Sequence, residues 1–218
     1  MASRYRCVVA DHDDTAVDST RLIHHPIYLE IMELLRPDAE PLDLHGFITM
    51  NRNGGIRKYY LDDLGFDEDE WESAYRHWVE HPLRDMTPRF YDGYLDVMER
   101  FKSEGGIYAV VSHSNEGPIR RHYEEATDGF FILDEVIGSE NGTKNKPDPW
   151  PLDMMMEKYA LSPDDIVVVD DLDPGIDMAV KRDVDTIGVG WSHYNPEGFK
   201  EKCKYYTDDV NELERILF

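Results

Sequence analysis

The chain has 218 residues, of which 41% are hydrophobic and 11% aromatic, enough to fill one sizeable core or a core with a smaller inserted domain. This apolar content argues against a disordered chain. The 46 acidic residues outnumber the 23 lysines and arginines and give a net charge of −23. That charge disfavours binding to nucleic acid or to an anionic membrane, because both need cationic contacts.

The two cysteines, Cys7 and Cys203, lie far apart and in no spacing typical of a metal or redox site. We therefore expect reduced thiols and a cytoplasmic protein. The first residues carry no signal-peptide pattern, and no apolar run approaches the ~20 residues of a membrane span. No membrane association is expected.

Four short apolar runs, rich in β-branched residues, predict buried parallel strands. They span residues 7–10, 107–111, 166–169 and 186–189, and a weaker fifth run spans 135–138. Helical patterns occupy the intervals between the later runs, most clearly over 90–101 and 152–159. This alternation predicts an α/β fold with a doubly wound, Rossmann-like parallel sheet.

The interval between the first and second predicted strands is too long for one crossover helix, which indicates an inserted domain. Its patterns are helical, most clearly over 22–35 and 71–79, with turn-forming connectors at 36–38 and 51–55. We predict a small helical cap inserted into the sheet domain. The expected boundaries are 1–17 for the first part of the core, 18–85 for the cap and 86–218 for the remainder of the core.

An Asp-x-Asp pair, Asp11 and Asp13, directly follows the first predicted strand. Three further Asp-x-Asp pairs occur elsewhere in this acidic chain, so the pair alone carries little weight. Its position distinguishes it, because the ligand crevice of an open parallel sheet lies beyond the carboxyl ends of the central strands. In the turn after a strand, two such carboxylates can straddle a phosphorus centre, one attacking and the other transferring protons.

Other polar residues follow the neighbouring predicted strands. Ser112 and His113 come after the second, Asp170 and Asp171 after the fourth, and Lys146 lies in a cationic turn between them. We expect these residues to meet at one edge of the sheet. Several carboxylates beside a phosphate need a compensating cation, and oxygen ligands of this kind suit Mg²⁺.

In this order and spacing, the motifs resemble those of the haloacid dehalogenase superfamily, in its phosphatase and phosphomutase branch, over nearly the whole chain. The resemblance implies a role for each strand-end residue. It makes Asp11 the nucleophile, Asp13 the general acid and base, Ser112 the phosphate-binding hydroxyl, Lys146 the lysine of the third motif and Asp171 a metal ligand, with Asp170 in the acidic position before it.

Two positions depart from the family pattern. Asp14 stands where the family usually has Gly, which keeps a residue that tolerates turn geometry but adds a charge. His113 stands where Asn is frequent, and it could donate to a phosphate.

We therefore predict a Mg²⁺-dependent phosphohydrolase that acts on a phosphorylated small molecule through an aspartyl-phosphate. The expected metal ligands are Asp11, Asp13, Asp170 and Asp171. The expected substrate contacts are Ser112, His113 and, in the cap, Arg52. Arg52, Arg57 and Lys58 flank Gly54 and Gly55, and a basic loop of this kind would suit an anionic substrate.

Alternative functions stay open at this stage. A sugar phosphomutase would retain the same motifs, and a non-catalytic binding protein could keep the fold. A dehalogenase would not need Asp13, and a phosphonate-cleaving relative would need a cap lysine for which Lys58 alone gives no support. The sequence leaves the phosphate ester undetermined and is compatible with a monomer or a homodimer. The nine histidines show no helical pair with Cys or Glu at ligand spacing, so no transition-metal site is expected.

Overall fold

The computed structural model describes residues 3–53 and 55–218. It divides into two compact units, which are described separately. The sheet unit comprises the chain up to Asp18 together with Arg89–Phe218, and the helical unit comprises Ser19–Pro88.

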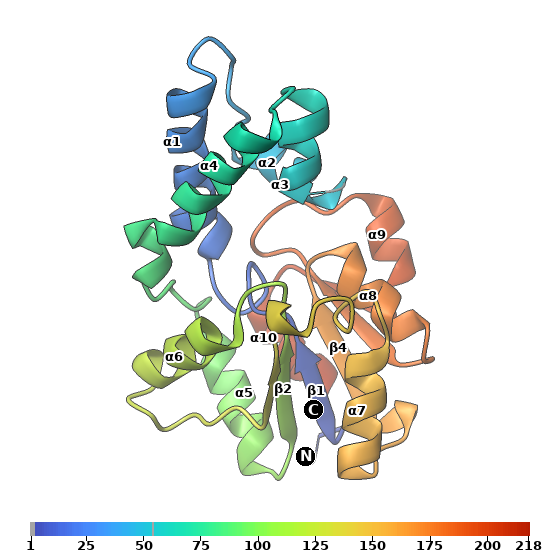
Figure 1. The fold of residues 1–218 in the computed structure, drawn as a ribbon. Helices are drawn as coiled ribbons and strands as arrows, with labels where there is room; N and C mark the ends of the chain where they lie inside the picture. The colour runs from blue at the N-terminus through green and yellow to red at the C-terminus, as the bar shows by residue number, and fades with distance from the viewer. Residues whose placement is uncertain (1–2, 54) are drawn as a thin grey trace. The chain divides into compact units, whose positions relative to one another are not determined.

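Within the described residues, the sheet unit contains six parallel strands in the order β3-β2-β1-β4-β5-β6. The central strand β1 pairs with both β2 and β4 (Figure 1), and the order reverses at this point, where open α/β sheets place their ligands. The predicted doubly wound parallel sheet is confirmed. The strands are β1 (Cys7–Ala10), β2 (Ile107–Val111), β3 (Glu135–Ile137), β4 (Ile166–Asp170), β5 (Asp185–Val189) and β6 (Tyr205–Thr207).

Helices cover both faces of this sheet because successive strand side chains point to opposite faces. Val8 and Ala10 of β1 pack in the cluster that contains residues of α5, α6 and α10, whereas Cys7 and Val9 pack with α7 and α8. Figure 1 shows α5 and α6 on one side of the sheet and α7 and α8 on the other. The helices of this unit are α5 (Tyr94–Ser103), α6 (Glu116–Ala126), α7 (Trp150–Tyr159), α8 (Asp173–Val180), α9 (Glu197–Lys202) and α10 (Val210–Leu217), with short 3-10 segments η4 (Ser139–Asn141) and η5 (Pro163–Asp165).

Two elements of the sheet unit differ from the sequence-based expectation. The helix expected from residue 90 begins at Tyr94, because Phe90 forms an antiparallel bridge with Val17 and Gly93 takes a left-handed φ of 82°. Strand β6 was not expected at all. It has only three residues and lies at the edge of the sheet, so it carries no apolar run for sequence reasoning to detect.

The helical unit has a hydrophobic core of its own, in which Ile27, Ile31, Phe47 and Tyr60 are buried. Asn51 and Arg52 were expected in a connector but belong to the end of α2, and Gly54 lies outside the described residues. The elements are η1 (Thr20–His24), α1 (His25–Leu35), α2 (Leu44–Arg52), α3 (Gly55–Lys58), η2 (Tyr59–Asp63), α4 (Glu68–Glu80) and η3 (Pro82–Asp85); η1 and η2 are π-helical, and η3 is a 3-10 turn.

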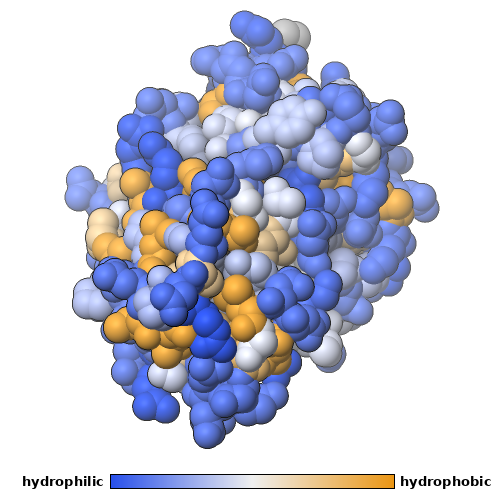
Figure 2. All heavy atoms as spheres, turned by 90° about the horizontal axis from the view of Figure 1, so that it is seen from above, coloured by the Kyte–Doolittle hydropathy of each residue, from blue (hydrophilic) through white to orange (hydrophobic). Residues whose placement is uncertain are grey.

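The exterior seen in Figure 2 is mainly hydrophilic, with hydrophobic residues gathered in smaller patches. This agrees with a composition in which 32% of the residues are charged. None of the helices formed by the described residues combines the length and apolar character needed to span a bilayer.

Candidate active site

The turn after β1 fixes the position of Asp11. Its amide N–H donates to the carbonyl of Val169 at 2.9 Å, which extends the pairing of β1 with β4 by one residue. The chain then turns back, and the amide of Asp14 donates to the carbonyl of Val17 at 2.8 Å. Asp14 has a φ of 60°, in the left-handed region that Asp tolerates better than most residues. Asp14 thus adopts a backbone angle that suits Gly, at the position where the sequence has Asp instead.

Lys146 connects two of the strand-end carboxylates. Its Nζ lies 2.7 Å from Oδ1 of Asp11 and 2.7 Å from Oδ2 of Asp170. All three residues are buried, with 6%, 6% and 1% of their surface exposed for Lys146, Asp11 and Asp170. The structure thus brings together residues from the ends of two neighbouring strands and from the loop before α7, as the sequence predicted.

Asp171 completes an acidic group with Asp11 and Asp170. Each of the three offers a carboxylate oxygen, and these oxygens lie within 4.8 Å of one another. Thr15 Oγ1 donates to Oδ1 of Asp171 at 2.8 Å. Burial raises the pKa of Asp171 well above its usual range, and the charges of Asp11, Asp170 and Asp14 raise it further.

The electrostatics of this group indicate a missing positive charge. Burial raises the pKa of Asp11 to about 6, with Asp170 and Asp13 adding to the rise and Lys146 opposing it. Burial by itself lowers the pKa of Lys146, but Asp11 and Asp170 together raise it above its usual value. One lysine cannot balance three buried carboxylates, and a hard divalent cation with oxygen ligands fits this donor set.

Asp13 lies beside the end of β2 rather than in the acidic group. Its Oδ2 accepts hydrogen bonds from Ser114 Oγ at 2.6 Å and from Ser112 Oγ at 3.3 Å. Ser112 Oγ in turn accepts from the amide of Ser114 at 3.0 Å. The structure therefore joins Asp13 to the predicted phosphate-binding serine, while a contribution of Asp13 to metal binding stays a prediction.

A network that sequence reasoning did not identify holds the Lys146 loop against β2. The buried Asn145 donates through Nδ2 to the carbonyl of Ser112 at 2.7 Å, and its Oδ1 accepts from the amide of Lys146 at 2.7 Å. His113 Nε2 donates to the carbonyl of Lys146 at 2.8 Å. His113 thus contacts the loop, and its role toward substrate stays a prediction.

Histidines near the site were also missed. His12, between the two predicted catalytic aspartates, is buried, and its Nε2 lies 3.0 Å from Nδ1 of His122. His193 Nε2 lies 3.6 Å from Oδ2 of Asp171. These contacts depend on chain segments far apart in sequence, so no local pattern predicts them.

Two expectations concern the helical unit. Arg52 lies at the end of α2, and its contact with substrate stays a prediction. The sequence offered no histidine pair with Cys or Glu at ligand spacing, but in the structure Glu30, His77 and His81 come together, and the absence of a transition-metal site stays a prediction. His77 lies in the last turn of α4 and His81 directly follows that helix, but Glu30 belongs to another helix, which the sequence pattern did not reveal.

Comparison with known proteins identifies the family. The haloacid dehalogenase-like hydrolase family matches residues 8–189, a range that includes Asp11, Lys146 and Asp171. The chain is a member of the haloacid dehalogenase-like hydrolases. Hydrolases of this family generally use a divalent metal ion, and the acidic group around Asp171 fits one.

Individual relatives of this haloacid dehalogenase-like hydrolase are named as phosphatases. PpaX of Caldanaerobacter subterraneus, a protein named for pyrophosphatase activity, is 26% identical over 229 residues, covering 96% of this chain and 93% of its own. The phosphoglycolate phosphatase of Thiobacillus denitrificans is 21% identical over 175 residues, covering 76% of this chain and 74% of its own.

Solved structures give the same result for the fold. The crystal structure of a protein from Haemophilus somnus 129pt, described as a predicted phosphoglycolate phosphatase, has a TM-score of 0.78 and 20% identity and covers 98% of both chains. The predicted family, the predicted fold and the prediction of a hydrolase of the phosphatase type are therefore confirmed.

Proposed function

We propose that this protein is a Mg²⁺-dependent phosphohydrolase that acts on a phosphorylated small molecule through an aspartyl-phosphate formed on Asp11. The observation that carries the proposal is the pair of 2.7 Å contacts from Lys146 to Asp11 and Asp170, next to the buried Asp171. The names of the relatives support hydrolysis of a phosphoryl group and differ in substrate.

In the proposed reaction, Asp11 attacks phosphorus and the bond to the leaving oxygen breaks, with Asp13 giving that oxygen a proton. Asp13 then takes a proton from water, and the water oxygen attacks phosphorus, releasing inorganic phosphate and restoring Asp11. A pKa of about 6 leaves Asp11 mainly ionised at neutral pH, as a nucleophile requires. Lys146 holds the Asp11 side chain in place and favours its ionised form.

Asp11, Asp170 and Asp171 would hold the magnesium ion, which when bound would offset their charge and that of the phosphate. Ser112 would donate its hydroxyl to a phosphate oxygen, and Ser114 would orient Asp13 through its 2.6 Å hydrogen bond. We propose the helical unit as a cap in which Arg52 recognises an anionic substrate. The cytoplasmic location stays a prediction.

The test is a screen of phosphorylated metabolites and an aryl phosphate with and without Mg²⁺. Wild type is expected to turn over with Mg²⁺ and to lose activity when a chelator removes it. Asp11→Asn is expected to reduce turnover to background and to keep the fold, because an amide is a poor nucleophile of nearly the same shape.

Asp69→Asn is the matched control, since Asp69 belongs to another Asp-x-Asp pair and is exposed on α4. It should behave as wild type. Retained turnover in Asp11→Asn, or full activity of metal-free wild type, would contradict the proposal.

A further inference from the structure

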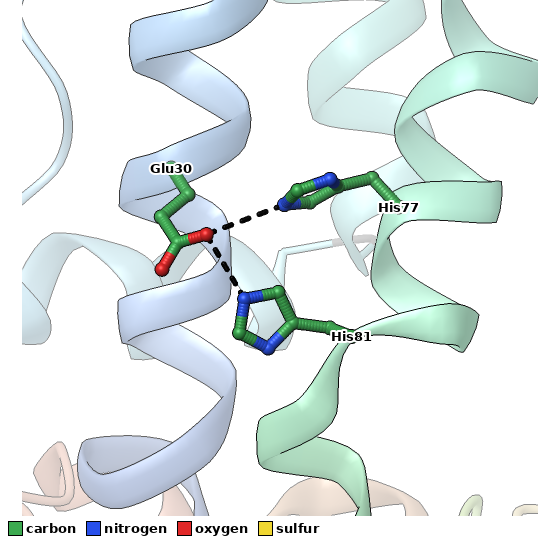
Figure 3. A group of neighbouring side chains, drawn as sticks. All are labelled: Glu30, His77 and His81. Atoms are coloured by element: carbon green, nitrogen blue, oxygen red, sulfur yellow. Dashed lines mark hydrogen bonds and ion pairs between the residues drawn. The ribbon is translucent and has the colours of Figure 1, made fainter.

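The helical unit contains a second cluster of metal-ligating side chains, formed by Glu30, His77 and His81 (Figure 3). His81 Nε2 lies 2.9 Å from Oε2 of Glu30, and His77 Nε2 lies 3.5 Å from the same oxygen. Figure 3 shows the three side chains pointing toward one another from α1 and from the end of α4. One carboxylate oxygen therefore faces two imidazole nitrogens.

The packing of the helical unit fixes this arrangement. His77 lies in the last turn of α4, and His81 is the residue that directly follows the helix, so both histidines lie at the end of α4. Glu30 comes from α1, whose next residue, Ile31, lies in the same buried core as Ala74 of α4. Pro82 directly follows His81 and begins the 3-10 turn η3, so the cluster sits where the helix ends.

We propose that Glu30, His77 and His81 form a binding site for a divalent transition-metal ion of the zinc class. Two imidazoles and one carboxylate are a donor set that Zn²⁺ uses with water in the fourth position. Tetrahedral bonds of ~2.0–2.2 Å place neighbouring donors ~3.3 Å apart, and the separations of the Glu30 oxygen from the two imidazole nitrogens, 2.9 Å and 3.5 Å, bracket that value.

Hydrogen bonding alone leaves the cluster incomplete. Nε2 of His77 is buried, and no group among the described residues makes a well-formed hydrogen bond with it. Its 3.5 Å separation from Glu30 exceeds the ~2.7–3.2 Å of an ordinary N–H···O bond. A metal ion between the two groups would give this nitrogen a partner.

The carboxylate side of the site is open and charged. The side chain of Glu30 is 52% exposed, which leaves a path for an ion and room for a water ligand. The hydrogen bond from His81 lowers the pKa of Glu30, so this carboxylate is ionised at neutral pH. The net charge of −23 also favours cations near the surface.

His81 determines what metal binding would change. Its Nδ1 accepts a hydrogen bond from the amide of Leu83 at 3.1 Å, so its proton lies on Nε2 and is donated to Glu30. Coordination through Nε2 would move that proton to Nδ1 and release the Leu83 amide. The free energy lost with this one hydrogen bond is small compared with the free energy of metal coordination by a three-residue donor set.

The experiment titrates the full-length protein with Co²⁺, a spectroscopic substitute for Zn²⁺, in excess Mg²⁺ and without substrate. Excess Mg²⁺ competes with Co²⁺ for oxygen-only sites, and the band is read without substrate, so the result does not depend on phosphatase turnover. Wild type is expected to develop the intense visible absorption of four-coordinate Co²⁺, to saturate at one equivalent and to lose the band when Zn²⁺ is added. The amide signal of Leu83 is expected to shift in the NMR spectrum on Zn²⁺ binding.

Variants locate the ion. His77→Gln and the partly exposed Glu30→Gln should each weaken binding by at least ~100-fold, above the range of ~10- to 100-fold for loss of a residue that only supports a ligand. The control is His45→Gln, because His45 is exposed on α2. This variant should bind Co²⁺ as tightly as wild type. A wild type without the Co²⁺ band would overturn the proposal, and so would equal binding by the two ligand variants and the His45 control.

Discussion

Lys146 is buried between two carboxylates, and its charge decides how many of them can stay ionised. Its Nζ is equidistant from Asp11 and Asp170 at 2.7 Å, while Asp171 accepts a hydrogen bond from Thr15 and lies 3.6 Å from Nε2 of His193. Removing one partner of a buried ion pair typically costs ~3–5 kcal/mol, because the remaining charge is left without compensation. The lysine thus orders Asp11, the proposed nucleophile, and Asp171 is the carboxylate of the three that we propose as a metal ligand without a contact to this lysine.

Asp13 is the residue whose replacement separates phosphate hydrolysis from displacement of a halide. Proton donation to the leaving oxygen contributes typically ~10²- to 10⁴-fold, so Asp13→Asn should lower kcat by about that factor for alkyl phosphates. The loss should be smaller for an aryl phosphate, whose leaving group departs without a proton. The measurement is a series of leaving groups on wild type and variant with Mg²⁺ present.

The slope of rate against leaving-group basicity is the decisive quantity in that series. A steeper slope for Asp13→Asn than for wild type supports the role of Asp13 as general acid. Parallel slopes for the two proteins would remove Asp13 from that role.

At the scale of elements, α8 packs against the acidic group through Gly175. A Cβ added at this position would lie 1.9 Å from Oδ2 of Asp170, the oxygen that binds Lys146. Gly175→Ala must therefore displace either α8 or the Asp170 side chain. We expect a loss of ~1–3 kcal/mol in the free energy of unfolding, typical of overpacking, together with a fall in Mg²⁺-dependent activity.

Gly117 provides the matched control for this substitution. It is exposed in α6, and a Cβ there would meet nothing within 4 Å. Gly117→Ala should leave activity unchanged and stabilise by up to ~1 kcal/mol, because Ala favours helix more than Gly does. Urea unfolding and kinetics compare the two variants, and equal effects would show that contact with Asp170 is unimportant.

The start of α4 carries a pH-dependent contribution to stability. Arg36 donates two hydrogen bonds to Glu70 at 2.7 Å and 2.8 Å, and Glu70 also closes the capping box with Asp67. The hydrogen bond from Arg36 is the largest cause that lowers the pKa of Glu70, to about 2. Since the pKa is lower in the folded state, the stabilisation is complete above the unfolded value of 4.5 and is lost as the pH falls toward 2.

Glu70→Gln is therefore expected to lower the melting temperature at pH 7 and to differ less from wild type as the pH falls from 5 toward 3. Thermal unfolding followed by circular dichroism across this range provides the measurement. Glu72→Gln, at an exposed position on the same helix, should match wild type throughout. A difference between Glu70→Gln and wild type that stays constant with pH would show that ionisation of Glu70 is not involved.

The sequence predicted most of the sheet because its strands are buried on both faces and form short, nearly continuous apolar runs. β6 was not predicted because it is a short edge strand. The start of α5 was placed too early because Phe90 fits the helical spacing while its backbone is extended. The periodicity of the sequence shows which residue types recur, but it does not show which backbone conformation a residue at the end of a helix or strand adopts.

The same limit applies to the site. Asp11, Lys146 and Asp171 were predictable because strand ends in a parallel sheet share one edge. Asn145, in the turn that contains Lys146, and Ser114 carry no distinctive signal, since their importance lies in contacts with Ser112 and Asp13. The pairing of Glu30 with His81 spans 51 residues and arises only when α1 packs on α4.

At the scale of the whole molecule, folding brings negatively charged groups of an acidic chain close together. A protein with a net charge of −23 buries Asp11, Asp14, Asp170 and Asp171, and Lys146 forms ion pairs with two of them, Asp11 and Asp170. Repulsion among these groups reduces the stability of the metal-free fold, and a cation that binds only the folded chain offsets it by mass action. The proposed Mg²⁺ site would therefore couple stability to metal binding through the same residues.

This coupling predicts two effects of opposite sign for Asp171→Asn. In Mg²⁺-free buffer the variant should melt at a higher temperature than wild type, because one buried negative charge is gone while the Thr15 hydroxyl still finds an amide oxygen. In wild type, Mg²⁺ at 100 times its Kd should add ~2.7 kcal/mol to the free energy of unfolding, or ~5–11 °C to Tm for a chain of this size. The variant should gain little of this increment.

Differential scanning calorimetry with Mg²⁺ and with a chelator measures both effects. The control is Asp164→Asn, at an exposed position of the sheet unit, which should gain as much from Mg²⁺ as wild type. A full Mg²⁺ increment in Asp171→Asn would remove Asp171 from the metal site, and a metal-free variant less stable than wild type would show that repulsion is not what limits the fold.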